Sequence, residues 1–346
     1  MTREGLPFDW QKTVWDSLAN ALKGQSLPHA FLLEGERHIG KTLFTRAFAK
    51  LVLCKNRKDN LACGACRSCS MISAGTHPDR LELESGENHV SIKVDDVRLL
   101  STFSQRSSHS GAARIAIIPE AHRMNSSASN ALLKTLEEPQ DQVYIILTSS
   151  EFGRLSATVR SRVQRIKMRS PSLQETTDFL SDELEEEGVL EFLRLSRGKP
   201  FIDGPEFSRQ ELSHYRDFQR CVLDTLFFKK SSYELQKCAF KLKPHSAIDE
   251  FFLIASEILK RNFIEQEGDI EKPCVSKEDI SNIRSKQNSA LEKAEFSENL
   301  ATFISFVESA QKVMKSSSNP NPQLLLDSLI WRWERLGSSL EKRNIN

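Results

Sequence analysis

The sequence predicts an α/β domain with a parallel sheet and a phosphate-binding loop, followed by an all-α region. Three observations lead to this prediction. Short apolar runs alternate with helical patterns through residues 1–168, as in a sheet whose strands are joined by helices. A glycine-rich loop follows the first of these runs, and from about residue 207 onward only helical periodicity remains.

The composition is that of a globular protein with more than one domain. The chain has 346 residues, of which 39% are hydrophobic and 27% charged, and these values exclude both a disordered tail and a membrane protein. No apolar run approaches the roughly 18 residues that cross a bilayer. The first ten residues also lack the apolar core of a signal peptide. We therefore expect a cytoplasmic protein.

The charge is almost balanced, with 48 basic and 47 acidic side chains and a formal net charge of +1. This balance argues against a protein that coats DNA through bulk electrostatics. Any contact with DNA must then come from a local basic face or from a larger assembly.

The elements of the first half can be predicted in order. Val14, Leu18 and Leu22 recur at a spacing of four and indicate an opening amphipathic helix. Short buried strands are predicted at 30–33, 114–118, 143–147 and 163–168. A helical stretch runs from Ser129 to Glu138, and Pro139 ends it.

After about Ser170 the pattern changes. The sequence Ser170-Pro171-Ser172 indicates a linker with a helix cap, and a strongly acidic helical stretch follows it. Three apolar stripes come later, and we interpret them as the core faces of helices. They are formed by residues 251, 255 and 258; by 300, 303, 307, 310 and 314; and by 325, 329, 333 and 336.

The segment from Gly35 to Thr42 fits the phosphate-loop pattern G-x-x-x-x-G-K-[ST] in full. Gly35 and Gly40 would let the backbone wrap a phosphate chain, and the amides that open the next helix would face the anion. Lys41 would reach the outer phosphates of ATP or ADP, and Thr42 would offer its hydroxyl to Mg²⁺. A chance match on an ordinary strand-turn-helix is the alternative, and the preceding strand disfavours it.

Hydrolysis of ATP also requires a carboxylate for magnesium, usually at the end of a second apolar strand. Here the run 114–118 is followed by Pro119 and Glu120. Glu120 is a candidate for positioning water, but proline has no oxygen for the metal's hydration shell. We therefore predict weak Mg²⁺ binding and a weak or absent ATPase activity.

Four of the seven cysteines have the spacing C-x8-C-x2-C-x2-C: Cys54, Cys63, Cys66 and Cys69. Four thiolates held by tight turns suit a structural, tetrahedral Zn²⁺ site. An iron–sulfur cluster and free thiols are the alternatives, although Ser73 stands where a further cluster cysteine would be expected. The remaining cysteines, at 221, 238 and 274, are interpreted as packing residues.

Several motifs in succession make the chain resemble the bacterial clamp-loader family, a branch of the AAA+ ATPases within DNA polymerase III. The resemblance is close over residues 8–168 and weak beyond them, where 321–329 carry most of it. The motifs are His29-Ala30, the phosphate loop, the four cysteines, Gly75-Thr76-His77-Pro78-Asp79, Val94-Asp95-Asp96-Val97-Arg98, Asn130-Ala131-Leu132-Leu133-Lys134-Thr135-Leu136-Glu137-Glu138-Pro139 and Ser161-Arg162.

Two branches of this family are plausible for this chain: the ATP-hydrolysing gamma/tau motor, and the delta-prime branch, whose ATP site is typically degraded. Pro119 favours delta-prime. So does Phe201, because the motor carries an arginine three positions after the glycine that corresponds to Gly198. The chain length and the lack of a long C-terminal extension agree with delta-prime, whereas the intact phosphate loop departs from some of its members.

The resemblance implies three domains: an AAA+ ATPase-like domain over 1–168 with the zinc knuckle at 54–69, a small helical lid over 169–206, and a helical collar over 207–346. It also implies a hetero-oligomeric ring with gamma/tau and delta subunits, which places a sliding clamp on primed DNA. The family carries a Ser-Arg-Cys motif where this chain has Ser161-Arg162-Val163. Arg162 is thereby implied to act in trans at a neighbour's ATP, with Arg160 and Arg165 as competitors.

Two functions of other classes remain as alternatives. A small-molecule kinase would use the phosphate loop on a nucleoside monophosphate, but it would leave the cysteines and the helical C-terminal third without a role. A zinc-dependent nucleic-acid module without ATP chemistry would need aromatic residues interleaved with basic ones, and the sequence lacks such a pattern.

Overall fold

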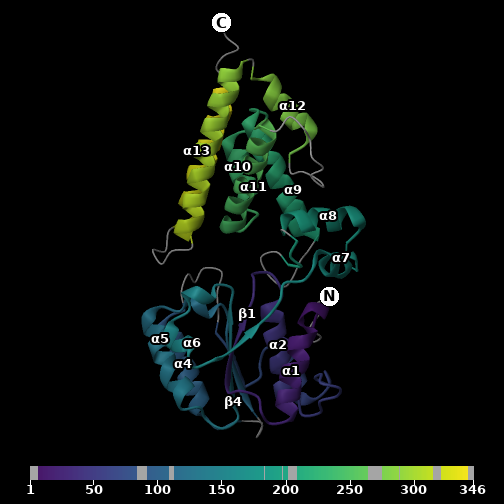
Figure 1. Cartoon of the computed structure of the whole chain (residues 1–346), viewed down its shortest axis with the longest axis vertical. Helices are drawn as coiled ribbons and strands as arrows, with labels where there is room; N and C mark the ends of the chain where they lie inside the picture. The colour runs from purple at the N-terminus through teal and green to yellow at the C-terminus, as the bar shows by residue number, and fades with distance from the viewer. Residues whose placement is uncertain are drawn as a thin grey trace. The chain divides into compact units, whose positions relative to one another are not determined.

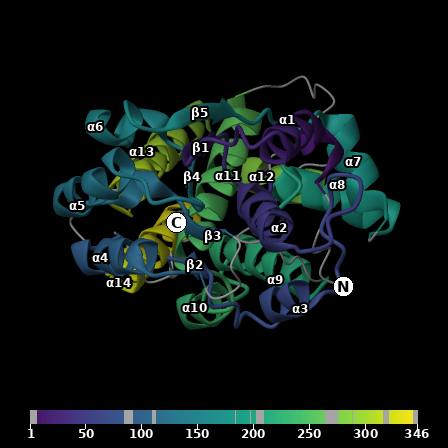
Figure 2. The ribbon, with the colours of Figure 1, turned by 90° about the horizontal axis from the view of Figure 1, so that it is seen from below.

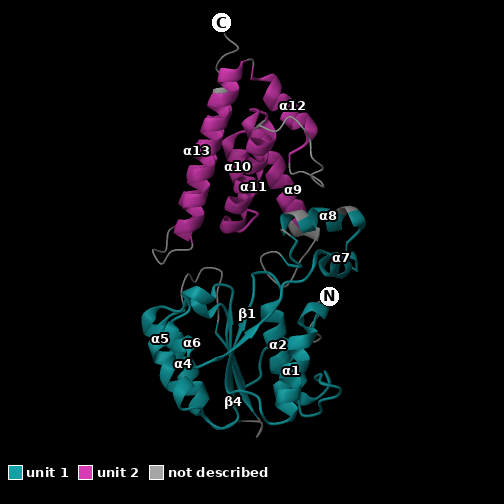
Figure 3. Cartoon of the chain, viewed as in Figure 1, with its two compact units in different colours: residues 1–206 teal, residues 207–346 magenta. Residues whose placement is uncertain are grey.

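The computed structural model describes residues 7–83, 92–108, 113–182, 184–196, 198–201, 209–263, 275–287, 289–314 and 321–341. The chain divides into two compact units, Met1–Glu206 and Phe207–Asn346 (Figure 3). Residues 169–206, for which the sequence predicts a separate lid domain, fall within the first unit. The division into three domains stays a prediction.

A parallel sheet of five strands lies at the centre of unit 1, in the order β2-β3-β4-β1-β5. The predicted α/β class is confirmed. Four strands fall where apolar runs predict them, but β2 has only three residues, which alternate in polarity, and was not predicted. The strands are β1 (Ala30–Glu34), β2 (Arg80–Glu82), β3 (Arg114–Ile118), β4 (Val143–Ser149) and β5 (Gln164–Lys167).

Helices cover both faces of this sheet, with α1 and α2 on one side and α4, α5 and α6 on the other (Figures 1 and 2). Strand β1 is therefore buried on both faces: Phe31 and Leu33 join one core cluster, while Ala30 and Leu32 join the other. The helices of unit 1 are α1 (Lys12–Lys23), α2 (Lys41–Leu53), α3 (Arg67–Ser73), α4 (Val94–Gln105), α5 (Ser126–Glu137), α6 (Ala157–Arg160), α7 (Leu173–Ser181) and α8 (Glu186–Leu195).

Two predicted helices agree with the structure in place but not at every boundary. Leu18 and Leu22 of α1 are buried, as their spacing requires. Helix α5 begins three residues before the predicted Ser129, because the Asn125 side chain accepts a hydrogen bond from the Ala128 amide at 2.8 Å and caps the helix. The cap moves the start of the helix into a polar segment that has no apolar periodicity.

Every regular element among the described residues of unit 2 is a helix, as predicted, and its core is built around three aromatic rings. The ring centroids of Phe251, Phe303 and Trp333 lie 5.0–5.8 Å apart. The helices are α9 (Arg209–Leu226), α10 (Ser232–Ala239), α11 (Pro244–Phe263), α12 (Lys277–Ser285), α13 (Ala290–Met314) and α14 (Pro322–Glu341). In the described parts of the chain, no helix combines the length and apolarity that a membrane span requires.

Candidate functional site

The predicted phosphate loop connects β1 to α2, and both of its glycines are required by their surroundings. Gly40 has a φ of 85°, and a Cβ there would lie 3.0 Å from a Phe201 ring carbon and 3.1 Å from one of Phe8. A Cβ on Gly35 would lie 2.7 Å from the Ile39 side chain. Both glycines thus lie where the loop packs closely against neighbouring groups of the protein.

Lys41 turns back onto the loop that precedes it. Its Nζ donates to the carbonyl oxygens of Gly35 and Glu36 at 3.0 and 2.7 Å, and it lies 3.4 Å from Glu120 Oε1. Burial lowers the pKa of Lys41, and the Glu120 carboxylate opposes this shift. Thr42 is half-buried in the first turn of α2. The structure therefore brings these two predicted site residues, Lys41 and Glu120, together in an ion pair.

Glu120 follows the buried Pro119 directly after β3 and has a left-handed backbone, with a φ of 43°. Its amide donates to Thr148 Oγ1 at 2.9 Å, and its carboxylate accepts from the Ser150 amide and hydroxyl at 3.2 and 2.5 Å. Burial alone would raise the pKa of Glu120, but Lys41 and Ser150 outweigh it, so the pKa is lowered. The carboxylate is held ionised beside the loop.

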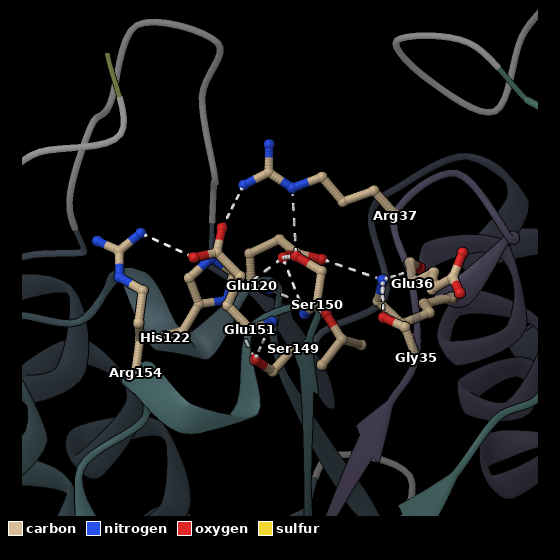
Figure 4. A network of polar contacts seen from close by, with 11 residues as sticks. Gly35, Glu36, Arg37, Glu120, His122, Ser149, Ser150, Glu151 and Arg154 are labelled. Atoms are coloured by element: carbon tan, nitrogen blue, oxygen red, sulfur yellow. Dashed lines mark hydrogen bonds and ion pairs between the residues drawn. The ribbon is translucent and has the colours of Figure 1, made fainter. Parts of the chain in front are cut away.

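A network of charged groups continues from this carboxylate (Figure 4). Arg37 pairs with Glu151 at 2.7 Å and donates to Ser150 Oγ at 3.3 Å, and Glu151 also pairs with Arg154 at 3.0 Å. The buried His122 lies between Glu120 and Glu151, and burial lowers its pKa. These groups were not predicted. The signal that points to them is their position after β1, β3 and β4, since the carboxyl ends of parallel strands share one edge of a sheet.

The chain that follows α8 also reaches the phosphate loop. The Lys199 ammonium pairs with the Glu36 carboxylate. Phe201, where the motor branch would carry an arginine, is 5% exposed and packs against Phe8 and Phe179 with ring centroids 5.5 and 5.4 Å apart. A buried aromatic ring thus lies beside Gly40 of the phosphate loop, at the position where the resemblance implies an arginine in motor subunits.

The four predicted cysteines meet in one cluster, with their sulfur atoms all within 4.8 Å of one another. The Cys54 sulfur lies 3.6 Å from that of Cys63 and 4.0 Å from that of Cys66. Ligands about 2.3 Å from a tetrahedral zinc ion would be about 3.8 Å apart. This group could hold a metal ion through its sulfur atoms, and its dimensions suit zinc.

Backbone amides supply charge stabilisation around these thiols. The amides of Cys63 and Cys66 donate to the sulfurs of Cys54 and Cys63 at 3.3 and 3.4 Å. Burial opposes ionisation of Cys66, but the amides of Cys69 and Lys55 lower its pKa to about 6. Burial raises the pKa of Cys69 to about 12. A bound cation would favour the thiolate form of all four.

Ser68, His77 and Asp79 lie close together beside this cluster, but they do not form a nucleophilic triad. The Ser68 hydroxyl donates to the Leu53 carbonyl at 2.7 Å and so accepts from His77 Nε2 at 2.9 Å. The Asp79 amide donates to His77 Nδ1 at 3.1 Å. This neutral imidazole donates to the serine instead of taking its proton, so the trio fastens α3 to the segment that precedes β2.

Arg162 lies just after α6 and is 36% exposed at its side chain. Its guanidinium pairs with Glu137 at the end of α5 and donates to the Thr158 carbonyl at 3.1 Å. The two competing arginines both lie over the Phe152 ring, Arg165 at 3.8 Å and Arg160 at 5.2 Å from its centroid. Arg165 also pairs with Glu34.

The other cysteines were predicted to be packing residues. Cys221 is buried in the core of unit 2, and Cys238 is half-buried against it. Cys274 lies outside the described residues.

Comparisons with known proteins agree on one family. Residues 10–172 match the family model described as DNA polymerase III, delta subunit. The chain is 34% identical over 196 residues to DNA polymerase III subunit delta' of Pseudomonas aeruginosa, an alignment that covers 56% of this chain and 59% of the relative. It is 25% identical over 331 residues to the subunit delta' of Buchnera aphidicola, covering 95% and 97% of the two chains.

DNA polymerase III subunits named tau or tau/gamma also match, over a smaller share of their length. The DNA polymerase III subunit tau/gamma of Haemophilus influenzae is 32% identical over 179 residues, which is 52% of this chain and 26% of the relative. Among solved structures, a gamma subunit-related protein of Thermotoga maritima aligns over 93% of this chain and 99% of its own, with a TM-score of 0.44 and 15% identity.

Proposed function

This chain belongs to the delta-prime family of DNA polymerase III subunits, and we propose that it is a clamp-loader subunit that donates Arg162 to the ATP site of a neighbouring motor subunit. Its partners are gamma/tau and delta subunits in a hetero-oligomeric ring. Through that ring it serves to load the sliding clamp onto primed DNA during replication.

One contrast between two sites carries this proposal. At the chain's own nucleotide site, the buried Pro119 occupies the position of the metal-binding aspartate, and Glu120 is left without that neighbour. Arg162, in contrast, is 36% exposed at its side chain. A planar guanidinium suits catalysis in trans because it neutralises phosphoryl charge without losing its proton. The chain therefore supplies a catalytic group to a neighbour and itself acts mainly as a stator.

Nucleotide binding by the chain itself is the second part of the proposal. The loop from Gly35 to Thr42 retains its lysine and hydroxyl, so ATP or ADP can bind, with little help from Mg²⁺. Hydrolysis is weak or absent, because Glu120 acts on water only beside a bound metal. The exposed end of the Glu36 side chain, 62% accessible, indicates that solvent reaches the loop.

Zinc is the metal that fits the cluster of Cys54, Cys63, Cys66 and Cys69. All four ligands are sulfur, and their separations of 3.6 and 4.0 Å match the edges of a zinc tetrahedron. With four protein ligands no position remains open for substrate, so the ion would have a structural role. It would fix the loop between α2 and α3 and brace that end of the ATPase-like domain.

The motor subunit itself is the second candidate, favoured by the complete phosphate loop. The experiment that separates the two is ATP hydrolysis by the isolated full chain, repeated with a tau/gamma-type motor subunit present. If the chain alone hydrolyses no ATP but raises the ATP turnover of its partner, the stator role is supported. Sustained turnover by the chain alone would overturn it and assign the chain to the motors.

A further inference from the structure

The ion pair between Arg162 and Glu137 has a geometry that bears on how Arg162 acts as an arginine finger, that is, as the arginine that one subunit donates to the ATP site of its neighbour. A guanidinium has five N–H donors, and two of them lie along the edge that carboxylates and phosphates bind in bidentate fashion. The Glu137 Oε1 atom lies 2.6 Å from both Nε and Nη2 of Arg162. The carboxylate therefore occupies the edge that a phosphate would need.

The opposite side of the guanidinium is also engaged. Its Nη1 donates to the Thr158 carbonyl at 3.1 Å and to the Ser161 hydroxyl at 3.2 Å. These contacts come from the chain just before Arg162 and can persist while the outer edge changes partner. The arrangement holds the arginine at a fixed place with only its Glu137 contact exchangeable.

The position of Glu137 on its helix is a second, independent observation. It is the last residue of α5, and Glu138 follows as the C-cap. Carboxylates are disfavoured there, because the C-terminus of a helix carries the negative end of its dipole. Arg162 is the cation that compensates Glu137. Releasing Arg162 then leaves an uncompensated carboxylate, and this cost opposes the release.

We propose that Glu137 is a positioning residue for Arg162. In the free subunit its carboxylate binds the edge of the guanidinium that would otherwise bind phosphate, and we call this the parking role of Glu137. Assembly exchanges the carboxylate for the phosphates of the neighbour's ATP. A triphosphate displaces the carboxylate because it carries more negative charge. The existing pair is also weak, because both of its members are well exposed, with side-chain accessibilities of 36% and 49%. A neighbouring site without nucleotide offers no such exchange, so the finger engages only a loaded site. This inference rests on the trans role of Arg162.

The test is a titration of the full chain into a fixed amount of a tau/gamma-type motor subunit with ATP, with ATPase activity as the signal. Glu137→Gln removes the competing charge and keeps the side-chain size. Its half-saturating concentration should fall about twofold to fivefold, which is the range for losing an exposed ion pair. Its maximal rate should equal the wild-type rate, because the engaged finger no longer touches residue 137.

Glu138→Gln is the matched control, since it removes the same charge one position away and should change neither quantity. Melting temperatures of both variants should equal the wild-type value, because both side chains are exposed. Equal half-saturating concentrations for the two variants would overturn the parking role. A reduced maximal rate in Glu137→Gln would also overturn it, because Glu137 would then support the engaged finger.

Arg162→Ala separates this inference from the proposed function. Loss of stimulation in Arg162→Ala, together with equal behaviour of the two glutamate variants, removes only the parking role. Full stimulation by Arg162→Ala would remove the finger itself, and the inference with it.

Discussion

The Lys41 ammonium and the Glu120 carboxylate lie 3.4 Å apart, so the two groups that a phosphate-loop enzyme directs at ATP and water form an ion pair with each other. Lys41 is 5% exposed and Glu120 22%. Each of these charges stabilises the ionised form of the other, because burial penalises an ionised group that has no partner. The pair holds the loop to the end of β3 whether or not the chain hydrolyses ATP.

We predict that Glu120→Gln lowers the free energy of unfolding by about 1–3 kcal/mol, because Lys41 then stays buried without a counter-charge. Urea unfolding followed by fluorescence measures the change. Glu36→Gln is the matched control: its partner is Lys199, the carboxylate is 62% exposed at its side chain, and the loss should stay below about 1 kcal/mol. Equal losses in the two variants would show that the buried pair contributes no more to the free energy of unfolding than the exposed pair does.

Pro119→Asp should give the chain the metal ligand that the proposed nucleotide site lacks. The new carboxylate would follow β3 next to Glu120, and Mg²⁺ should then strengthen ATP binding by about an order of magnitude. Binding of a fluorescent ATP analogue with and without Mg²⁺ measures this effect. Pro119→Ala is the control, because it removes the proline ring without adding a carboxylate. If both variants respond to Mg²⁺ in the same way, Pro119 is not the cause of the weak site.

Stability should fall in mild acid because His122 is buried as a neutral group. Burial lowers the pKa of His122 below the ordinary value of 6.5, although Glu120 and Glu151 oppose this shift. Above pH 6.5 neither the folded nor the unfolded state binds the proton. As the pH falls below 6.5, the unfolded state takes it up first, so the stability that the neutral imidazole contributes is lost.

The measurement is the melting temperature of wild type and His122→Gln between pH 7.5 and 5. The wild-type value should decline more steeply, since glutamine does not titrate. Parallel declines in the two proteins would assign the acid sensitivity to other groups.

Metal analysis of the purified chain should find about one zinc per chain and no iron. Cys69→Ser should lose the metal and melt earlier, because Cys69 is fully buried among the other three thiols. Cys238→Ser, in unit 2 and half-buried, is the control and should keep the zinc. Less than about half an equivalent of zinc in wild type would contradict the proposed site.

Much of this arrangement follows from local patterns in the sequence. Strand β1, the phosphate loop and the cysteine cluster are set by apolar runs and by spacing, so each can be predicted without knowing what packs against it. The residues around Glu120 could not be predicted in this way. Ser150 and Glu151 are thirty or more positions away in sequence from Glu120, and only the pairing of β3 beside β4 brings Ser150 to Glu120 and Glu151 to His122.

The same limit explains two further omissions. Strand β2 was missed because a short edge strand carries little apolar signal, and its identity depends on pairing with β3. The Arg162–Glu137 pair joins the segment after α6 to the end of α5 and has no signature along the chain. Contacts between elements are a property of the folded sheet and its helices, and local periodicity does not contain them.

The decisive measurement for the trans role of Arg162 is ATP turnover by the reconstituted clamp-loader complex containing Arg162→Ala. At the motor site next to this chain, turnover should fall by about 10³-fold, as it does when an arginine finger is removed. Arg162→Lys should restore little of it, because an ammonium lacks the planar fork of a guanidinium. A complex that assembles with Arg162→Ala and hydrolyses ATP at the wild-type rate would contradict the account.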